Sequence, residues 1–344
     1  MPQSTTADPA TAVARPRVAV TLGDPAGVGP ELAVRLLAVD SNRAAADIIV
    51  VATRAELDRA QAEAGVTVPV SDDGAPGTVR LVDGLDEPGD DVPLREVSEA
   101  AGRVTLSRLE RALDLARAGE VEAIVFAPLN KTSLHLAGMH EEDELRWFAR
   151  ELGHDGVTSE LNILGQLWTA RVTSHIPHGE VAPHITTDAV TRSLGLLHEV
   201  LRDTGISQPR IGVAALNPHN GENGLFGRQE IDEIAPAVEA AAARGWNVRG
   251  PFPADTIFLR RDEFDGILTM YHDQGQIAMK LLGFDGGVTV QGGLPVLIAT
   301  PAHGTAFDLV GTGRAALTST QNAFDIAASV AASRVAAPAA GTGA

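Results

Sequence analysis

The chain has 344 residues, 44% of them hydrophobic, which is enough for two domains that share a cleft. It contains no cysteine, so disulfides, thiolate metal sites and cysteine nucleophiles are excluded. A formal net charge of −18 predicts a surface that repels nucleic-acid phosphate, so no nucleic-acid partner is expected.

No apolar stretch has the length of a membrane span, and the first residues lack the apolar core of a signal peptide. We therefore expect a cytoplasmic protein without a membrane partner. Residues 1–15 and the tail 336–344 are rich in small residues and proline, and we expect both ends to be disordered.

Strands and helices are predicted to alternate along the chain. The first strand is 17–23, followed by a Gly/Pro-rich turn and a helix from about Glu31. Further on, the predicted strands are 46–53, 122–129, 169–175, 209–219 and 265–272, and the predicted helices are 98–119, 143–153, 186–205 and 230–245. Residues 270–280, "MYHDQGQIAMK", are interpreted as turn-like. The alternation is typical of an α/β protein with a largely parallel sheet.

Three of the predicted strands end at a histidine, namely His175, His219 and His272. Ligands of open α/β sheets sit beyond the carboxyl ends of the strands, so these imidazoles are candidates for one metal site with open positions. Acidic and amide neighbours such as Glu222 and Asp273 could orient such ligands. The alternative is that each histidine is simply solvated at the start of a loop.

Three loops carry further candidate residues. "TLGDPAGVGPE" contains Asp24 and has the form of a strand, a tight turn and a helix start, which suits an anion or substrate loop as well as a plain turn. "APLNKTS" places Lys131 after a buried strand, either as a surface charge or as a cation of the cleft. "PAHGTAFDLVGTG" is a Gly-rich loop suited to a nucleotide.

Taken together, these segments resemble the 4-hydroxythreonine-4-phosphate dehydrogenase (PdxA) family from about residue 17 to 331. The motifs that carry the resemblance include "APLNKTSLHLAG", "VTSHIP", "LNPHNGENG", "PFPADTIF" and "MYHDQGQIAMK". The resemblance implies a two-lobed fold like that of isocitrate and isopropylmalate dehydrogenases, with an inter-lobe cleft. We expect one lobe from 16–135 with 300–335 on the cofactor side, and a second lobe from 136–299 on the metal and dimer side.

The resemblance also implies cofactors, a partner and residue roles. It implies NAD or NADP, one divalent metal (Zn, or Mg, Mn or Co), and a homodimer whose active site lies at the subunit interface. Two of the three metal histidines would come from one subunit and the third from the other. The implied residues are His175, His219 and His272 for the metal; Lys280, Asp255 and Lys131 for catalysis; Lys280 and Asp24 for substrate; and Gly304, Thr305, Asp308 and Gly311 for the cofactor.

The chain departs from the family at its substrate contacts. Where the family has Gly-His-Thr-Glu, this chain has Asp143, Glu144, Leu145 and Arg146. Where it has a substrate asparagine and arginine, this chain has Thr289 and Ile298. A carboxylate at Glu144 repels a phosphate dianion in a cleft with little water, and Leu145 donates no hydrogen bond. Arg146 is the candidate compensating cation.

The predicted reaction is oxidation of a secondary hydroxyl beside a chelating oxygen, followed by decarboxylation of the resulting β-keto acid. Leu145 and Ile298 favour a non-phosphorylated substrate with an apolar face, such as a cis-dihydrodiol carboxylate of the terephthalate type. The alternatives are 4-hydroxythreonine 4-phosphate or threonate or erythronate 4-phosphate. Two alternatives from other function classes are a non-catalytic ligand-binding relative and a metal hydrolase with three histidine ligands.

Overall fold

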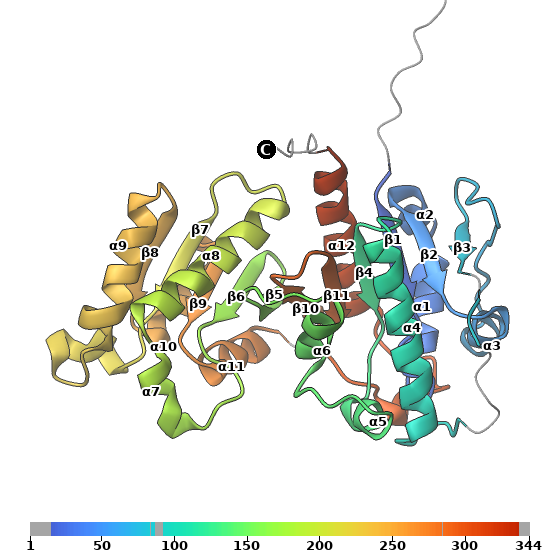
Figure 1. Cartoon of the computed structure of the whole chain (residues 1–344), viewed down its shortest axis with the longest axis horizontal. Coiled ribbons are helices and arrows are strands. Elements are labelled where there is room, and N and C mark those ends of the chain that lie inside the picture. Colours follow the sequence, from blue (N-terminus) through green and yellow to red (C-terminus); the bar gives the residue numbers. More distant parts are fainter. Residues whose placement is uncertain (1–14, 83, 87–91, 284, 337–344) are drawn as a thin grey trace, which may run out of the picture.

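The computed structural model describes residues 15–82, 84–86, 92–283 and 285–336 (Figure 1). The ends predicted to be disordered lie outside these ranges, except for Arg15 and Ala336. No helix in the described ranges is long and apolar enough to cross a bilayer.

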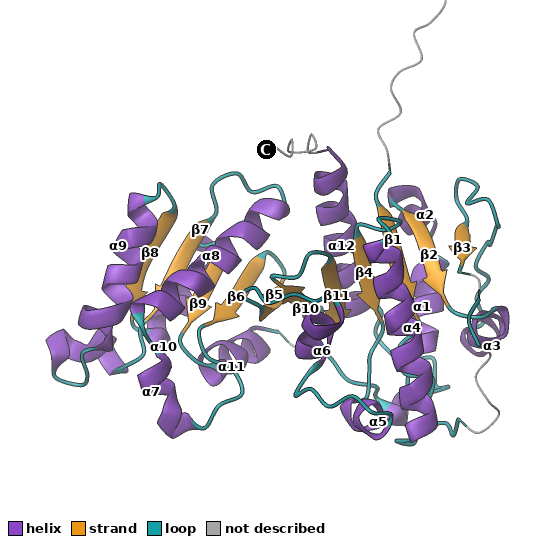
Figure 2. Cartoon of the chain, in the orientation of Figure 1, coloured by secondary structure: helices purple, strands orange, loops and turns teal. Residues whose placement is uncertain are grey.

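A single sheet runs through the molecule, from β3 on one side to β8 on the other (Figures 1 and 2). Its strand order is β3-β2-β1-β4-β11-β10-β5-β6-β9-β7-β8. The strands are β1 (Arg17–Thr21), β2 (Asp47–Val51), β3 (Val79–Leu81), β4 (Ala123–Phe126), β5 (Ser159–Leu164), β6 (Leu167–Arg171), β7 (Arg210–Ala214), β8 (Asn247–Phe252), β9 (Gly266–Thr269), β10 (Val288–Gly292) and β11 (Leu297–Pro301).

Two parallel arms meet at an antiparallel centre. The β3–β11 arm and the β6–β8 arm are parallel throughout, whereas β10 pairs antiparallel with both β11 and β5, and β5 pairs antiparallel with β6. Strands such as β2 ("DIIVV") and β4 ("AIVF") are nearly continuous apolar runs because helices cover both faces of the parallel arms. The predicted α/β class with a mostly parallel sheet is confirmed.

Helices cover both faces of the sheet (Figure 2). The helices are α1 (Gly29–Leu37), α2 (Asp40–Ala45), α3 (Arg54–Ala64), α4 (Glu99–Arg117), α5 (Lys131–Leu136), α6 (Glu144–Glu151), α7 (Val181–His184), α8 (Thr187–Asp203), α9 (Ala235–Ala243), α10 (Ala254–Ile257), α11 (His272–Leu282) and α12 (Thr318–Ala336). Apolar side chains of α4, α5 and α6 pack on one face of the β1–β11 arm, and those of α1 and α12 pack on the other. In the second arm, α8 and α9 lie in the same core cluster as α12.

The division into two lobes stays a prediction. Helix α12 packs on β1, β4 and β11, as expected if the C-terminal segment belongs with the first lobe. The sheet nevertheless continues without a break across the proposed boundary, because β10 and β5 join the two arms.

A buried ion pair ties α3 to α4, and its removal should be costly. Arg108 Nη2 lies 3.0 Å from Glu56 Oε2, and both side chains are almost fully buried. Arg108→Met leaves the Glu56 carboxylate buried without a cation. We expect the free energy of unfolding, measured with urea at neutral pH, to fall by about 3–5 kcal/mol. Arg192→Met removes an exposed pair with Asp188 on α8 and should cost less than about 1 kcal/mol. Equal losses in the two variants would contradict this assignment.

Candidate functional site

A cavity of about 460 Å³ opens over the antiparallel centre of the sheet. Its lining comes from β4, β5, β10, β11, α5, α6, α11 and the loop after β11. The polar and charged lining residues are Lys131, Glu144, Glu160, Asn162, His272, Gln276, Lys280, Thr289, Gln291, Thr300 and His303. Five residues predicted from sequence as catalytic, substrate or metal residues therefore meet here, namely Lys131, Glu144, His272, Lys280 and Thr289, with a sixth, Gly304, of the proposed cofactor loop.

Strand register explains why the floor of this pocket is polar. Thr289 of β10 pairs with Asn162 of β5 and Thr300 of β11, and Gln291, two residues later in β10, pairs with Glu160, two residues earlier in β5. Because side chains alternate between faces with a period of two, these pairs project to the same side. Asn162 Nδ2 donates to Thr289 Oγ1 at 3.2 Å.

The floor is held by a network from neighbouring elements. Asn162 Oδ1 accepts from Gln276 Nε2 of α11 at 2.6 Å and from Arg171 Nη1 of β6 at 2.8 Å. Arg171 also pairs with Glu160, directly across the β5–β6 hairpin, and both side chains are largely buried. The network fixes α11 against the sheet and leaves Arg171 with little capacity for a ligand.

Glu144 reaches the pocket from the first turn of α6. Asp143 caps this helix, because its Oδ1 accepts from the backbone N of Arg146 at 2.9 Å. The Glu144 carboxylate lies 3.4 Å from Lys131 Nζ, at the start of α5. Burial raises the pKa of Glu144, and the nearby Lys131 ammonium partly offsets that rise.

Helix α11 corrects the interpretation of residues 270–280 as turn-like. The helix begins at His272, and His272, Gln276 and Lys280 follow one another at a spacing of four, so all three line the pocket. His272 Nδ1 is 2.7 Å from the Asp273 carboxylate, a hydrogen bond that lowers the pKa of Asp273. Lys280 lines the pocket, and its predicted contact with substrate stays a prediction.

The sequence analysis predicted that His175, His219 and His272 each end a strand, and this prediction is wrong. β6, β7 and β9 end at Arg171, Ala214 and Thr269, so the imidazoles lie on the segments that follow. The physical reason is that backbone pairing ends before the histidines. Arg171 of β6 pairs with Thr269 of β9, and neither strand continues beyond that pair.

His175 and His272 come together in one chain, with ring centroids 5.7 Å apart. His175 Nδ1 also lies 2.9 Å from Glu142 Oε1 and 3.6 Å from Asp143 Oδ2. One donor atom from each of Glu142, Asp143 and His175 lies within 4.8 Å of the other two. Imidazole and carboxylate are suitable ligands for a divalent ion of the zinc or manganese type, so the donor set fits the predicted metal.

His219 lies on a different element, where its ring packs beside Phe226 at a centroid distance of 6.3 Å. Residues His219–Asn223 all have positive φ, a left-handed conformation that costs non-glycine residues roughly 1–2 kcal/mol each. Glu230 anchors the entry to this loop, because its carboxylate accepts from the backbone N of Leu216 and Asn217 and from Asn217 Nδ2 at 2.7–3.0 Å.

Several predicted residues lie outside the pocket lining. Asp24 is fully buried; its carboxylate accepts from the backbone N of Ala26 at 2.8 Å, and burial raises its pKa. Asp255 is exposed on α10, beside the loop that carries His219. Arg146 is exposed and lines a separate cavity.

Leu145 and Ile298 were expected to present an apolar face to the substrate, and the structure places them elsewhere. Both belong to the core cluster under α4 and α6, where Ile298 is fully buried and Leu145 nearly so. For Ile298 the reason is the sheet register, because Ile298 pairs with Ile124 of β4 and lies beneath the covering helices. Leu145 is a buried residue of α6 itself.

The proposed cofactor loop is divided between interior and surface. Gly304 lines the pocket, and the Thr305 carbonyl accepts from the backbone N of Val28 at 3.0 Å. A Cβ on Gly27 would lie 2.7 Å from Thr305 Cβ, so the glycine is needed for the two loops to touch. Asp308 and Gly311 are exposed beyond this contact.

Six polar residues of the pocket lining were not among the predicted site residues: Glu160, Asn162, Gln276, Gln291, Thr300 and His303. A signal was present, because "SELNIL" and "VTVQG" alternate polar and apolar residues as half-buried strands do. Neither segment was predicted as a strand.

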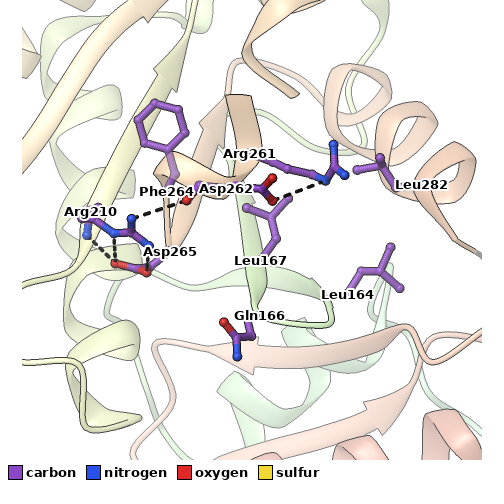
Figure 3. Close-up of a pocket in the computed structure, with 9 residues that line it drawn as sticks. All are labelled: Leu164, Gln166, Leu167, Arg210, Arg261, Asp262, Phe264, Asp265 and Leu282. Atoms are coloured by element: carbon purple, nitrogen blue, oxygen red, sulfur yellow. Dashed lines mark hydrogen bonds and ion pairs between the residues drawn. The ribbon is translucent and has the colours of Figure 1, made fainter. Parts of the chain in front are cut away.

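A second cavity, of about 300 Å³, lies at the β5–β6 turn (Figure 3). Figure 3 shows that Arg210 is paired with Asp265 and Arg261 with Asp262 beside three leucines. Because its cations are already neutralised and no predicted site residue lines it, we place the functional site in the first cavity.

The conformation of the loop that carries His219 should depend on the hydrogen bonds that the Glu230 carboxylate accepts. In Glu230→Gln, a single amide oxygen cannot replace a carboxylate that accepts three N–H groups, so the loop should loosen. If His219 is a metal ligand, affinity for Zn²⁺ alone should fall about 10–100-fold by titration calorimetry. Glu233→Gln is the matched control, because Glu233 binds Thr187 at the start of α8 instead. Unchanged affinity in Glu230→Gln would remove this loop from the metal site.

A family model and named relatives match most of this chain. The family model described as "Pyridoxal phosphate biosynthetic protein PdxA" matches residues 36–327. A putative 4-hydroxythreonine-4-phosphate dehydrogenase 2 of Pseudomonas aeruginosa is 51% identical, over 91% of this chain and 96% of that protein. A D-threonate 4-phosphate dehydrogenase of Salmonella typhimurium is 38% identical, over 87% and 94% of the two chains.

Solved structures show the same relationship. A 4-hydroxythreonine-4-phosphate dehydrogenase from Burkholderia phymatum has a TM-score of 0.78 at 37% identity, covering 92% of this chain and 98% of that one. A terephthalate 1,2-cis-dihydrodiol dehydrogenase from Burkholderia xenovorans has a TM-score of 0.66 at 31% identity, covering 88% and 94%. The chain therefore belongs to the PdxA family.

Proposed function

We propose that this protein is a nicotinamide- and metal-dependent dehydrogenase that oxidises a secondary hydroxyl of a short hydroxy acid. The observation that carries the proposal is the alignment of His272, Gln276 and Lys280 along one face of α11, in the same pocket as Gly304. A potential metal ligand, a cation for an acid group and the proposed cofactor loop thus surround a single cavity.

The comparisons favour the threonine and threonate alternatives over the cis-dihydrodiol preferred from sequence. Relatives named for 4-hydroxythreonine 4-phosphate and D-threonate 4-phosphate are 51% and 38% identical to this chain. The apolar face expected from Leu145 and Ile298 lies in the core. We therefore propose an acid with the carbon skeleton of 4-hydroxythreonine or threonate, whose 4-phosphates are the compounds named for these relatives. Decarboxylation of the product has no support and is not proposed.

Residue roles follow from position. His175 and His272 would hold the metal, with His219 as the further ligand predicted by the resemblance, and a divalent ion there lowers the pKa of a bound hydroxyl. Lys280 binds the acid group or stabilises the developing alkoxide. Lys131 is paired with Glu144, so its expected role is to bind substrate, not to act as a free base.

A purified-enzyme assay tests the proposal. With Mn²⁺ or Zn²⁺, NADH or NADPH should form from at least one of D-threonate, 4-hydroxythreonine or their 4-phosphates. Lys280→Met should lower kcat at least about 10²-fold, because it removes a charged group at the reacting end. Glu151→Gln, at the far end of α6, should leave kcat unchanged. A cis-dihydrodiol carboxylate oxidised faster than every threonine-type acid would overturn the choice of substrate.

We also propose that a second copy of this chain covers part of the α11 surface. Ile277 and Leu281 lie one turn apart on α11 and are 57% and 82% exposed, and Leu225 and Phe226 are exposed beside the left-handed loop that carries His219. Such apolar exposure favours an interface between subunits, as the resemblance implies.

Leu281→Glu should therefore weaken a dimer. Sedimentation velocity should show a shift from dimer to monomer at micromolar concentration, because a charge replaces an apolar contact. Leu94→Glu, which changes an exposed leucine just before α4, should remain dimeric. A wild-type protein that sediments as a monomer would contradict the proposal.

A further inference from the structure

The pocket has two ends of different chemistry. We define the α11 end by His272, Gln276 and Lys280, and the α6 end by Lys131, Glu144, Glu160 and Gln291. Glu144 and Glu160 both line the pocket, so two carboxylates face the α6 end. Both are largely buried, where charge interactions are stronger than in water.

The donors near the α6 end are already engaged. Lys131 pairs with Glu144 at 3.4 Å, and Arg171, behind the floor, pairs with Glu160. The formal charges of Lys131 and Arg171 are thereby cancelled by the two carboxylates. Lys280, at the α11 end, carries the remaining positive charge of the lining.

An acceptor at the α6 end has no partner. Gln291 is 3% exposed, lines the pocket, and its Oε1 makes no hydrogen bond to any described residue. A buried acceptor without a partner costs about 1–3 kcal/mol, and a ligand group that donates a hydrogen bond removes that cost. A phosphate dianion offers only acceptors, so it could bind the Gln291 amide through Nε2 alone and would face the carboxylates of Glu144 and Glu160.

The orientation of the substrate follows from the two ends. Its acid group pairs with Lys280, and the reacting hydroxyl lies beside His272. The far carbon of a four-carbon chain then reaches the α6 end. We propose that the α6 end selects a free terminal hydroxyl on this carbon, which donates to Gln291 or Glu144 and accepts from Lys131, in place of a phosphate ester. This inference rests on the proposed function and names the substituent that the pocket accepts.

The test compares each acid with its 4-phosphate in the full-length protein with metal and nicotinamide cofactor. Wild-type kcat/KM should be at least about tenfold higher for D-threonate than for D-threonate 4-phosphate, with the same order for 4-hydroxythreonine. Inorganic phosphate at millimolar concentration should not compete with the free acid. Glu144→Gln should raise kcat/KM for the 4-phosphate about tenfold and make the enzyme sensitive to inorganic phosphate, because it removes one negative charge. Glu151→Gln, on the same helix but outside the pocket, should change neither value.

A wild-type preference for the 4-phosphates, or competition by inorganic phosphate, would overturn the inference and leave the dehydrogenase proposal intact. A Glu144→Gln variant that loses activity toward the 4-phosphate would also overturn it, since Glu144 would then support phosphate binding by holding Lys131. If Glu144→Gln does not fold, the wild-type ratio and the phosphate competition decide. Absence of turnover with all four acids would instead reject the proposed function.

Discussion

The antiparallel centre of the sheet is the constraint on which the site depends. In the flanking parallel arms both faces are buried under helices, so their strands carry apolar residues almost throughout. At β10 and β5 the strands run in opposite directions, and one face remains open between α6 and α11. Polar side chains are tolerated there because they bond to one another and to a cavity, not to a sealed core.

Charge pairing then determines what this open face can bind. Asn162 joins the floor to α11 and to Arg171, and Arg171 neutralises Glu160. Lys131 does the same for Glu144. The buried Arg171–Glu160 pair adds little net stability, yet removal of one partner leaves a costly charge, so the pair preserves the arrangement of the pocket. The balance leaves Lys280 as the cation able to attract an acid group and Gln291 as the acceptor awaiting a donor.

The three histidines that we propose as metal ligands lie on separate elements of the fold. His175 and His272 converge because β6 and β9 are neighbours that end at the same level, so the segments after them start side by side. His219 follows β7, one strand further away, and its left-handed loop is held by buried Glu230. Strain of this kind is retained where surrounding contacts overdetermine it and is concentrated at functional sites. Exposed Leu225 and Phe226 beside it are consistent with a loop that serves a second subunit.

The sequence by itself determined the α/β class and the approximate positions of β1, β2, β4, β6, β7 and β9, because apolar runs are local signals. The roles of the three histidines and Lys280 stay predictions. It did not reveal β5 and β10, whose polar residues pair with each other across more than a hundred positions of the chain, nor β11, which pairs with β10. It also assigned Leu145 and Ile298 to the substrate, whereas both lie in the core, Leu145 as a buried residue of α6 and Ile298 through its pairing with Ile124. Tertiary structure decided which side chains share the pocket and which charges are already paired, since both depend on contacts between distant segments.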